Sequence, residues 1–295
     1  MKVDLKGLTL AVLGGDEREL VYVPNLIGSN AKVNIVGFDN CKPIKRANHY
    51  SSIDKAIDDV DAVIMPMPGT DTEGRIRAIY SKNKFYFTEN TAAKLSGIPI
   101  FIGVAKPIIK RLCFNYSIPL IEIAELDEIA ILNSIPTAEG ALLIAMEETP
   151  FTIHNSNCFV LGYGRIGVTL ANTLKSLGAN TFAAARSSKD LARIYEQNLN
   201  AVEFSRLGDS ISKADIIFNT VPSMVLDENI LKNIKKNTII IDLASAPGGT
   251  DFQTAEKLGI KAVLAPGLPG KVAPLTAGKI LARVLPKLIC ENLRV

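Results

Sequence analysis

The sequence predicts an α/β protein with two doubly wound parallel-sheet domains. Short apolar runs typical of strands alternate with helical patterns along the whole chain. The composition, 47% hydrophobic over 295 residues, suits parallel strands that are buried on both faces. A glycine pattern, Gly162-x-Gly164-x-x-Gly167, lies in the middle of the chain and leaves room for a separate domain before it.

The first half predicts a flavodoxin-like domain over residues 1–135 that holds the substrate. Expected strands cover 8–13, 33–37, 61–65, 99–104 and 118–123, and expected helices cover 18–27 and 72–80. The turn from Gly14 to Arg18 lacks the third glycine of a dinucleotide-binding turn, which favours a domain without a nucleotide. Asp16 and Arg18 follow the first strand, so we expect them to bind substrate.

A connecting helix is expected over residues 136–150, opened by the segment Asn133–Gly140. Pro136 suits a first helical turn, where its missing N–H has no cost. Free N–H groups at a helix start favour an anion, so Asn133 and Thr137 are expected to bind substrate there, at a cleft between the domains. The alternative is that Asn133 only caps the helix.

The second half predicts a Rossmann domain over residues 151–273, because six strands alternate with helices. Expected strands cover 158–161, 180–185, 201–204, 215–219, 238–242 and 261–265. Expected helices cover 165–177, 189–197, 207–213, 228–235 and 252–258. A last helix over 274–293, within a C-terminal segment 274–295, is expected to bend near Pro286 and to pack back on the first domain.

The glycine pattern follows a strand and opens a helix, which is the context that an NAD(P)-binding turn requires. Gly162 allows the tight turn, Gly164 lets the backbone approach a pyrophosphate, and Gly167 lets the helix pack closely on the strand. Arg165 and Ile166 begin the helix on which the phosphates would rest. The alternative is a glycine-rich turn that binds nothing.

The end of the second Rossmann strand favours NADP over NAD. The acidic residue that binds a ribose hydroxyl is missing, and Arg186, Ser187 and Ser188 stand there instead. An arginine followed by two hydroxyls suits a 2′-phosphate. In the alternative, Arg186 stacks on the adenine and tolerates either cofactor, so NAD remains open.

Three more strand ends supply candidates, because ligands of doubly wound sheets lie at the carboxyl ends of the strands. Thr220, Val221 and Pro222 are expected to flank the nicotinamide. Further candidates for cofactor contact are Asp242 and Ala244, and candidates for catalysis are Asn133, Ser134, Ser245 and Lys271. Surface roles for Ser245 and Lys271, and a structural role for Asp242, stay open.

The composition excludes several function classes. The 33 basic and 30 acidic residues are scattered, which argues against nucleic acid. No apolar run approaches the length of a membrane span, and we expect no signal sequence at the start of the chain. Four cysteines lie far apart and only two histidines occur, so we expect no metal site, reduced thiols and a cytoplasmic protein.

The connecting helix and the second half resemble the D-2-hydroxyacid dehydrogenase and formate dehydrogenase family. The spacing of Asn133 and Ala138-Glu139 matches that family's substrate-contacting asparagine and A-E pair. Ser245 stands in place of its substrate-binding arginine and Gly267 in place of its acid–base histidine. Because oxidation of a hydroxyl needs a general base, we expect no useful activity on simple hydroxyacids.

Nearly the whole chain resembles the A-subunit family of dipicolinate synthases. The segments that carry the resemblance are G-G-D-x-R (14–18), N-S-I-P-T-A-E-G (133–140), A-R-S-S (185–188), D-L-A-S-x-P-G-G-T-D-F (242–252) and A-P-G-L-P-G (265–270). The resemblance implies an oxidoreductase that acts on a CH–CH donor: dihydrodipicolinate is oxidised to dipicolinate, and NAD(P) accepts the hydride. It also implies sporulation, a location in the mother cell, and a flavoprotein-like second subunit. We further expect a homo-oligomer.

Two other functions stay open. In one, this chain only binds NADP and the second subunit, and the chemistry occurs in that partner. In the other, it is a 2-hydroxyacid dehydrogenase-like oxidoreductase with relocated catalytic residues. Hydride transfer by the chain alone, and turnover of hydroxyacids, discriminate among the three.

Overall fold

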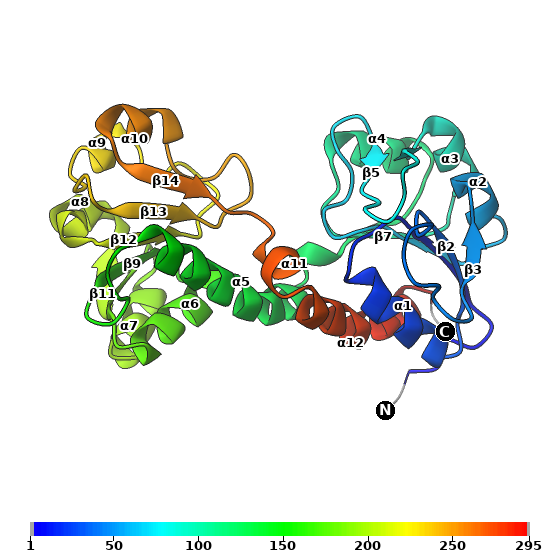
Figure 1. The fold of residues 1–295 in the computed structure, drawn as a ribbon, viewed down its shortest axis with the longest axis horizontal. Coiled ribbons are helices and arrows are strands. Elements are labelled where there is room, and N and C mark those ends of the chain that lie inside the picture. Colours follow the sequence, from blue (N-terminus) through cyan, green and yellow to red (C-terminus); the bar gives the residue numbers. More distant parts are fainter. Residues whose placement is uncertain (1–2, 294–295) are drawn as a thin grey trace. The chain divides into compact units, whose positions relative to one another are not determined.

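The computed structural model describes residues 3–293. The chain divides into two compact units. Unit 1 comprises residues 1–132 together with 273–295, and unit 2 comprises residues 133–272. Each unit is built on its own six-stranded parallel sheet (Figure 1). The expected fold class, two parallel-sheet α/β domains, is therefore confirmed.

The sheet of unit 1 has the strand order β3-β2-β1-β4-β7-β8. Its strands are β1 (Thr9–Leu13), β2 (Lys32–Val36), β3 (Asn48–Tyr50), β4 (Ala62–Ile64), β7 (Ile100–Ile102) and β8 (Leu120–Glu122). Without the three-residue edge strand β3, the order of the remaining strands is the 2-1-3-4-5 of flavodoxin. The flavodoxin-like expectation holds with one added edge strand.

Helices cover both faces of this sheet, and alternate strand residues face opposite cores. Ala11 packs with α2 (Ile53–Ala56), α3 (Glu89–Lys94) and α4 (Pro107–Asn115). Val12 packs on the other face with α1 (Glu19–Gly28) and α12 (Pro274–Leu293). Helix α12 lies against α1 in Figure 1 and buries Leu281, Val284, Leu285 and Ile289 in this core. The last helix thus packs on the first domain, as expected.

Unit 2 has the strand order β11-β10-β9-β12-β13-β14, which is the 3-2-1-4-5-6 order of a Rossmann sheet. Its strands are β9 (Asn157–Leu161), β10 (Asn180–Ala185), β11 (Asn200–Glu203), β12 (Ile216–Asn219), β13 (Ile239–Asp242) and β14 (Lys261–Leu264). Its helices are α6 (Arg165–Ser176), α7 (Ser188–Glu196), α8 (Leu207–Ser210), α9 (Glu228–Leu231), α10 (Phe252–Leu258) and α11 (Leu268–Val272), and 3₁₀ turns cover Phe204–Arg206 and Ile211–Lys213.

Two apolar cores in unit 2 follow the same alternation. Cys158 and Val160 face the core formed with α6 and α7, whereas Phe159 and Leu161 face the core formed with α8, α9 and α10. Six buried strands with helices on both faces explain the near-continuous apolar runs of the second half of the sequence.

The connecting helix begins earlier than the sequence predicts. Helix α5 runs over Asp127–Glu148, after a 3₁₀ turn at Ile123–Glu125, so Asn133 and Pro136 lie inside it. Two acidic residues, Asp127 and Glu128, fill its true first turn, where the helix dipole favours negative charge. The helix tolerates the missing N–H of Pro136 in its interior. The expected helix start near Asn133 and Thr137 is therefore wrong, and the free N–H groups of this helix lie near Asp127 instead.

The helix expected over residues 72–80 is also wrong. This stretch contains β5 (Arg75–Ile76), which pairs in antiparallel fashion with β6 (Phe85–Tyr86). The Asp71 carboxylate accepts hydrogen bonds from the backbone N–H groups of Glu73 and Arg75, both at 2.9 Å. Gly74 has a φ of +83°. Side-chain bonds to the backbone and a left-handed glycine both oppose a helix. The sequence patterns also gave no sign of β3 or of helices α2, α3 and α4.

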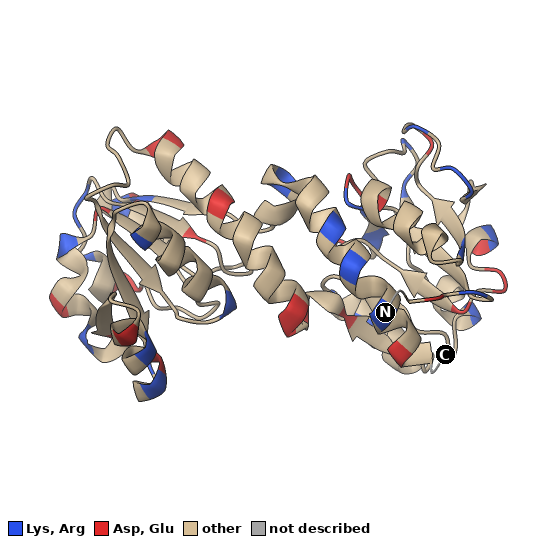
Figure 2. Ribbon diagram, turned by 90° about the horizontal axis from the view of Figure 1, so that it is seen from below, with Lys and Arg blue, Asp and Glu red and all other residues tan. Residues whose placement is uncertain are grey.

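Charge is dispersed over both units. Figure 2 shows basic and acidic segments interspersed, with no broad region of one sign. Among the described residues, one helix, α5, has the length and composition of a membrane span. Half of its most apolar window is buried inside the protein, and buried core helices of soluble proteins pass the same test.

Candidate functional site

The glycine turn of unit 2 joins β9 to α6. Gly162 has a φ of +96°, and a Cβ there would lie 2.5 Å from Thr220 Oγ1. A Cβ on Gly167 would clash with the Gly162 carbonyl oxygen, so the helix sits directly against the turn. A Cβ on Gly164 meets nothing within 4 Å. Space is therefore open over Gly164, at the start of α6, as a bound pyrophosphate requires. Arg165 and Ile166 form the first turn of α6, with Arg165 exposed.

A buried hydrogen-bond network fixes the ends of β12 and β13 beside this turn. Asp242 is fully buried, and its carboxylate accepts bonds from Asn219 Nδ2, Gly249 N and Thr250 Oγ1 at 3.0, 2.9 and 2.7 Å. It also accepts the N–H of Ala244 at 3.1 Å. Asp242 is thus saturated and holds the loop from Ala244 to Thr250. The structural role that the sequence left open for Asp242 is thus observed, and its direct contact with a cofactor stays a prediction.

The side chains at the end of β12 lie closer to the surface. Thr220 is half-buried, and its hydroxyl donates to the Leu161 carbonyl at 2.9 Å. The Val221 N–H donates to Asn219 Oδ1 at 3.0 Å, which fixes the turn that follows. Val221 is half-buried and Pro222 is exposed. The structure therefore places Thr220 and Val221 next to Gly162 of the glycine turn, and Pro222 follows them.

Arg186 is exposed at the end of β10, with its guanidinium carbon 5.7 Å from the centroid of the Phe204 ring. Ser187 caps α7: its Oγ accepts the Asp190 N–H at 3.0 Å and donates to the Asp190 carboxylate at 2.7 Å. Ser188 is the exposed first residue of α7. The Asp190 carboxylate is thus engaged by Ser187, and Arg186 and Ser188 are exposed.

The residues expected on the connecting helix are mostly used inside the protein. Ser134 is fully buried, and its hydroxyl lies 2.6 Å from that of Thr169 on α6. The Thr137 hydroxyl donates to the Asn133 carbonyl at 2.7 Å, within the helix. Both hydroxyls are therefore hydrogen-bonded within the protein, and the catalytic role expected for Ser134 and the substrate contact expected for Thr137 stay predictions. Asn133 differs, since its amide Oδ1 is buried without a hydrogen-bond partner.

Ser245 and Lys271 are both exposed. Ser245 lies in the loop that Asp242 holds, and its carbonyl accepts the Gly248 N–H at 2.9 Å. Lys271 lies in α11, the short helix after β14, and has no ion-pair partner among residues 3–293. Both side chains are accessible to a ligand, but neither is paired with a second group that would mark it as an acid or a base.

At the end of β1 in unit 1 lies a buried charged cluster formed by Asp16, Arg18, Glu19 and Tyr22. Arg18 donates from Nε and Nη2 to the two oxygens of Asp16, at 2.8 and 2.7 Å, and only 7% of Arg18 is exposed. Burial would raise the pKa of Asp16, but the bonds from Arg18 hold it below its ordinary value. Because Asp16 and Arg18 satisfy each other, their expected substrate contact is not supported by the geometry.

Glu19 completes this cluster and was not among the residues that the sequence singled out. Its carboxylate accepts the Asp16 N–H at 2.6 Å and the Tyr22 hydroxyl at 3.3 Å, and the residue is 1% exposed. Burial and the negative charge of Asp16 raise the pKa of Glu19 to about 7. No motif marks a helix-start glutamate as unusual, because acids are common in the first turn of helices.

Arg77 was also absent from the candidates, because it lies in the stretch expected to be helical. Its Nε lies 3.8 Å from Asp16 Oδ2, and its side chain is 53% exposed. Arg77 therefore stands on the solvent side of the buried Asp16–Arg18 pair, where a ligand can reach it.

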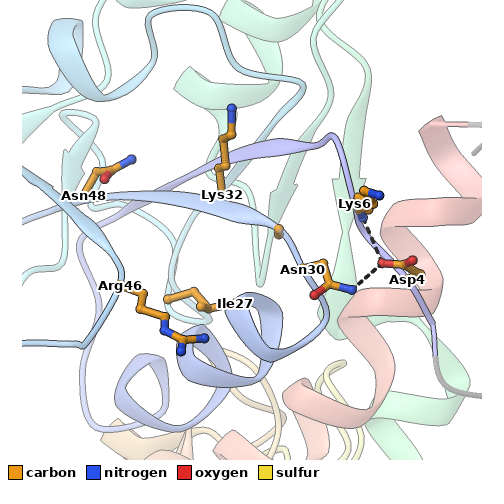
Figure 3. Close-up of a pocket in the computed structure, with 8 residues that line it drawn as sticks. Asp4, Lys6, Ile27, Asn30, Lys32, Arg46 and Asn48 are labelled. Carbon is orange, nitrogen blue, oxygen red and sulfur yellow. Dashed lines mark hydrogen bonds between the residues drawn. The ribbon is translucent and has the colours of Figure 1, made fainter.

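Two hollows lie at opposite ends of the unit 1 sheet. The larger, of about 950 Å³, is at the amino ends of β2 and β3 (Figure 3). Figure 3 shows the side chains of Lys32 and Arg46 extending in different directions from the backbone, and Asp4 bonded to Asn30 and to the Lys6 N–H. These cations do not converge on one point. The second hollow, of about 550 Å³, lies at the carboxyl end, where Arg77 is found.

No group of three or more His, Cys, Asp or Glu side chains that could hold a metal occurs within the described part of the chain. The four cysteines are all free.

Two family models match the chain. The model of the N-terminal domain of the dipicolinate synthase A-subunit matches residues 9–124. The NAD-binding domain model of D-isomer specific 2-hydroxyacid dehydrogenases matches residues 141–248, which include the glycine turn, Arg186 and Asp242.

The dipicolinate synthase A-subunit of Bacillus subtilis (strain 168) is 42% identical over 289 residues, which cover 97% of each chain. The crystal structure of the B. subtilis A-subunit superposes with a TM-score of 0.93 at 41% identity, over 100% of this chain and 99% of that one. The Bacillus halodurans A-subunit superposes with a TM-score of 0.92 at 39% identity, over 97% and 99%. D-Lactate dehydrogenase of Escherichia coli, with a TM-score of 0.62 at 13% identity over 97% of each chain, shares the fold alone.

Proposed function

The chain belongs to the A-subunit family of dipicolinate synthases, and we propose that it oxidises dihydrodipicolinate to dipicolinate with NADP as the hydride acceptor. Its second unit is an NAD-binding domain of the dehydrogenase type. The single observation that carries the proposal is the open space over Gly164 at the start of α6, in a chain that aligns with this family over nearly its full length.

The residues of unit 2 fit a nicotinamide dinucleotide. Gly164 leaves room for the pyrophosphate, Arg186 offers an exposed cation for a 2′-phosphate, and Thr220 and Val221 stand on a rigid turn next to the glycines. When bound, the nicotinamide accepts the hydride that leaves the substrate ring. The ring also loses a proton to solvent water and becomes aromatic.

Aromatisation lowers the demand on this chain, whose residues mainly have to hold the ring in place. Positioning of the reactants alone lowers the activation barrier by roughly 7–11 kcal/mol in favourable cases. Ser245 and Lys271 are the accessible polar side chains of the expected set, and Asn133 offers an unpartnered buried oxygen. We assign these three residues to orienting the substrate, because each retains hydrogen-bonding capacity that Ser134 and Thr137 have spent.

The test is hydride transfer by the purified chain. The chain is mixed with dihydrodipicolinate and NADP, and reduced cofactor and dipicolinate are both quantified. We expect them to appear in equal amounts. Lactate, glycerate and formate serve as controls and should give no turnover, because Ser245 and Gly267 stand where dehydrogenases of that class carry arginine and histidine. Robust turnover of a hydroxyacid would instead favour a 2-hydroxyacid dehydrogenase.

A second candidate function is that of a binding subunit whose flavoprotein-like partner carries out the chemistry. The observation that favours it is the burial of Ser134 and the saturation of Asp242, which leave the expected set of residues without a paired acid and base. The same assay distinguishes the two. Under this alternative, the chain alone binds NADP without turnover, and activity appears only when the second subunit is added.

We also propose a role in sporulation, in the cytoplasm of the mother cell, and assembly with a second subunit, which membership in a family of A-subunits supports. Assembly of copies of this chain with one another stays a prediction. Co-expression with the second subunit followed by size-exclusion chromatography tests the assembly. A single peak that contains both chains is expected, and separate peaks would contradict it.

A further inference from the structure

A hollow of about 550 Å³ opens at the carboxyl edge of the unit 1 sheet. Its walls come from residues 68–71, 75–79 and 81, which belong to the long segment after β4. Ligands of doubly wound sheets bind at this edge, and small-molecule sites have volumes of this order. The hollow contains two arginines, Arg75 and Arg77, and one acid, Asp71.

The backbone under both arginines is fixed. The Gly15 N–H donates to the Arg77 carbonyl at 2.8 Å, and the Ile79 N–H donates to the Gly15 carbonyl at 3.1 Å. The Asp71 carboxylate holds the N–H of Arg75 at 2.9 Å. The segment is therefore organised before any ligand arrives, which lowers the entropy lost on binding. These contacts also explain Gly14 after β1, because a Cβ there would clash with the Arg77 carbonyl oxygen.

The positive charge of the hollow is not neutralised by its neighbours. Asp16 is the nearest acid to Arg77, with 3.8 Å between Oδ2 and Nε, but it is already bound by both donors of Arg18. Arg75 has no ion-pair partner within the described range of the chain. Two guanidinium groups and one carboxylate, that of Asp71, therefore line the hollow, and their net positive charge attracts an anionic ligand.

An apolar wall stands beside these cations. Ile79 is 43% exposed, and Ala78 is half-buried next to it. A guanidinium pairs with a carboxylate through two parallel hydrogen bonds, and an apolar wall suits a flat ring. We propose that this hollow binds a cyclic dicarboxylate, with Arg77 as the primary carboxylate ligand and Arg75 as the second cation. The identity of that ligand as the substrate rests on the proposed function.

The experiment is calorimetric titration of the full chain with pyridine-2,6-dicarboxylate, using Arg77→Gln and Arg75→Gln. Lys32→Gln is the matched control: it removes the same charge from the opposite edge of the same sheet, in the hollow of Figure 3. We expect Arg77→Gln to weaken binding roughly tenfold to a hundredfold, the range for one lost charge-assisted hydrogen bond. Arg75→Gln should weaken it less, and Lys32→Gln should change it by less than about twofold.

Hydrogen exchange of the unit 1 strands shows whether unit 1 is folded in each variant. The affinity for NADP, which we propose binds in unit 2, should not change. Unchanged dicarboxylate binding in both arginine variants overturns the proposal, as does an equal loss in Lys32→Gln, because that would indicate general charge attraction. If Arg77→Gln does not fold, the binding measured for Arg75→Gln tests the proposal by itself. Arg75 is exposed and has no ion pair in the described part of the structure, so its replacement should not affect folding.

Failure of this site and failure of the proposed function give different results. Binding that depends on Arg77, without any hydride transfer by wild type, leaves the site in place and removes the function. Turnover by wild type with an unchanged KM for the substrate in Arg77→Gln leaves the function in place and removes the site. No binding of the dicarboxylate to wild type overturns the site directly.

Discussion

At the scale of a single residue, we propose that Arg186 sets the choice between NADP and NAD. Its guanidinium is exposed beside the Phe204 ring, and the neighbouring Asp190 is engaged by Ser187. We predict that Arg186→Ala weakens NADP binding by about 1.5–3 kcal/mol, roughly ten- to a hundredfold, because one charge-assisted contact to the 2′-phosphate is lost. NAD binding should change little. Fluorescence titration with both cofactors measures this.

Arg193→Ala is the control for this prediction. Arg193 is an arginine of α7, the helix that follows Arg186, and its Nη1 forms an ion pair with Glu196 Oε2 at 3.1 Å. Its loss should leave the ratio of the two affinities as it is in wild type. Equal affinity of wild type for NADP and NAD would contradict the assignment.

Glu19 gives a prediction on pH. Its pKa is about 7 in the folded chain and close to the ordinary 4.5 in the unfolded chain. Below pH 4.5 the group is protonated in both states and contributes no pH dependence. As the pH rises from about 4.5 to 7, the unfolded chain loses the proton first, so the free energy of unfolding falls, by about 3 kcal/mol in all.

Glu19→Gln should remove this loss. A glutamine still accepts the Asp16 N–H and can donate to the Tyr22 hydroxyl, but it does not titrate. Urea unfolding at pH 5 and pH 8 measures the effect. The variant should gain stability over wild type at pH 8 relative to pH 5. If the free energies of unfolding of wild type and Glu19→Gln differ by the same amount at both pH values, the pKa of Glu19 is not raised.

At the scale of an element, two substitutions in the β9–α6 turn distinguish an effect on cofactor binding from an effect on stability. Gly164→Ala places a methyl group in open space where the pyrophosphate is expected, so NADP affinity should fall at least tenfold with an unchanged Tm. Gly167→Ala instead forces a methyl group against the Gly162 carbonyl oxygen. We expect it to cost about 1–3 kcal/mol of stability, because neither backbone segment can yield easily.

Calorimetric unfolding and cofactor titration of both variants provide the measurement. Ordinary NADP affinity in Gly164→Ala would show that the cofactor phosphates do not lie over this turn. An unchanged Tm in Gly167→Ala would show that the turn is softer than its contacts indicate.

At the scale of the whole molecule, the C-terminal helix completes the first unit. Leu285 of α12 is fully buried in the core that contains Val12 and Tyr22. We predict that Leu285→Ala destabilises unit 1 by about 2–5 kcal/mol through the cavity it leaves. NADP affinity should stay normal, because the cofactor residues belong to unit 2.

Hydrogen exchange resolves the two units in this test. Faster exchange should be confined to the strands of unit 1, whereas Leu275→Ala, an exposed position on the same helix, should leave exchange unchanged. Equal acceleration in both units would show that the chain unfolds as one cooperative body.

The sequence by itself determined the features that depend on local pattern. The alternation of apolar and helical segments predicted the two sheets and α12, and the spacing of Gly162, Gly164 and Gly167 predicted the cofactor turn. These predictions work because burial on both faces and backbone geometry leave a signature within a few consecutive residues.

Only the tertiary structure decided which polar side chains are free. The sequence suggested that Ser134 and Arg18 are free to bind a ligand, but they form hydrogen bonds with Thr169 and Asp16. Arg77 was not predicted as a site residue, because it lies in a stretch predicted to be helical. Helix α5 also continues through Pro136, so it begins earlier than the sequence predicts. Hydrogen bonding and burial depend on partners that the fold brings together from distant parts of the chain. Ser134 meets a residue of α6, and Asp16 meets a residue of the segment after β4. No local pattern of residues records such pairs.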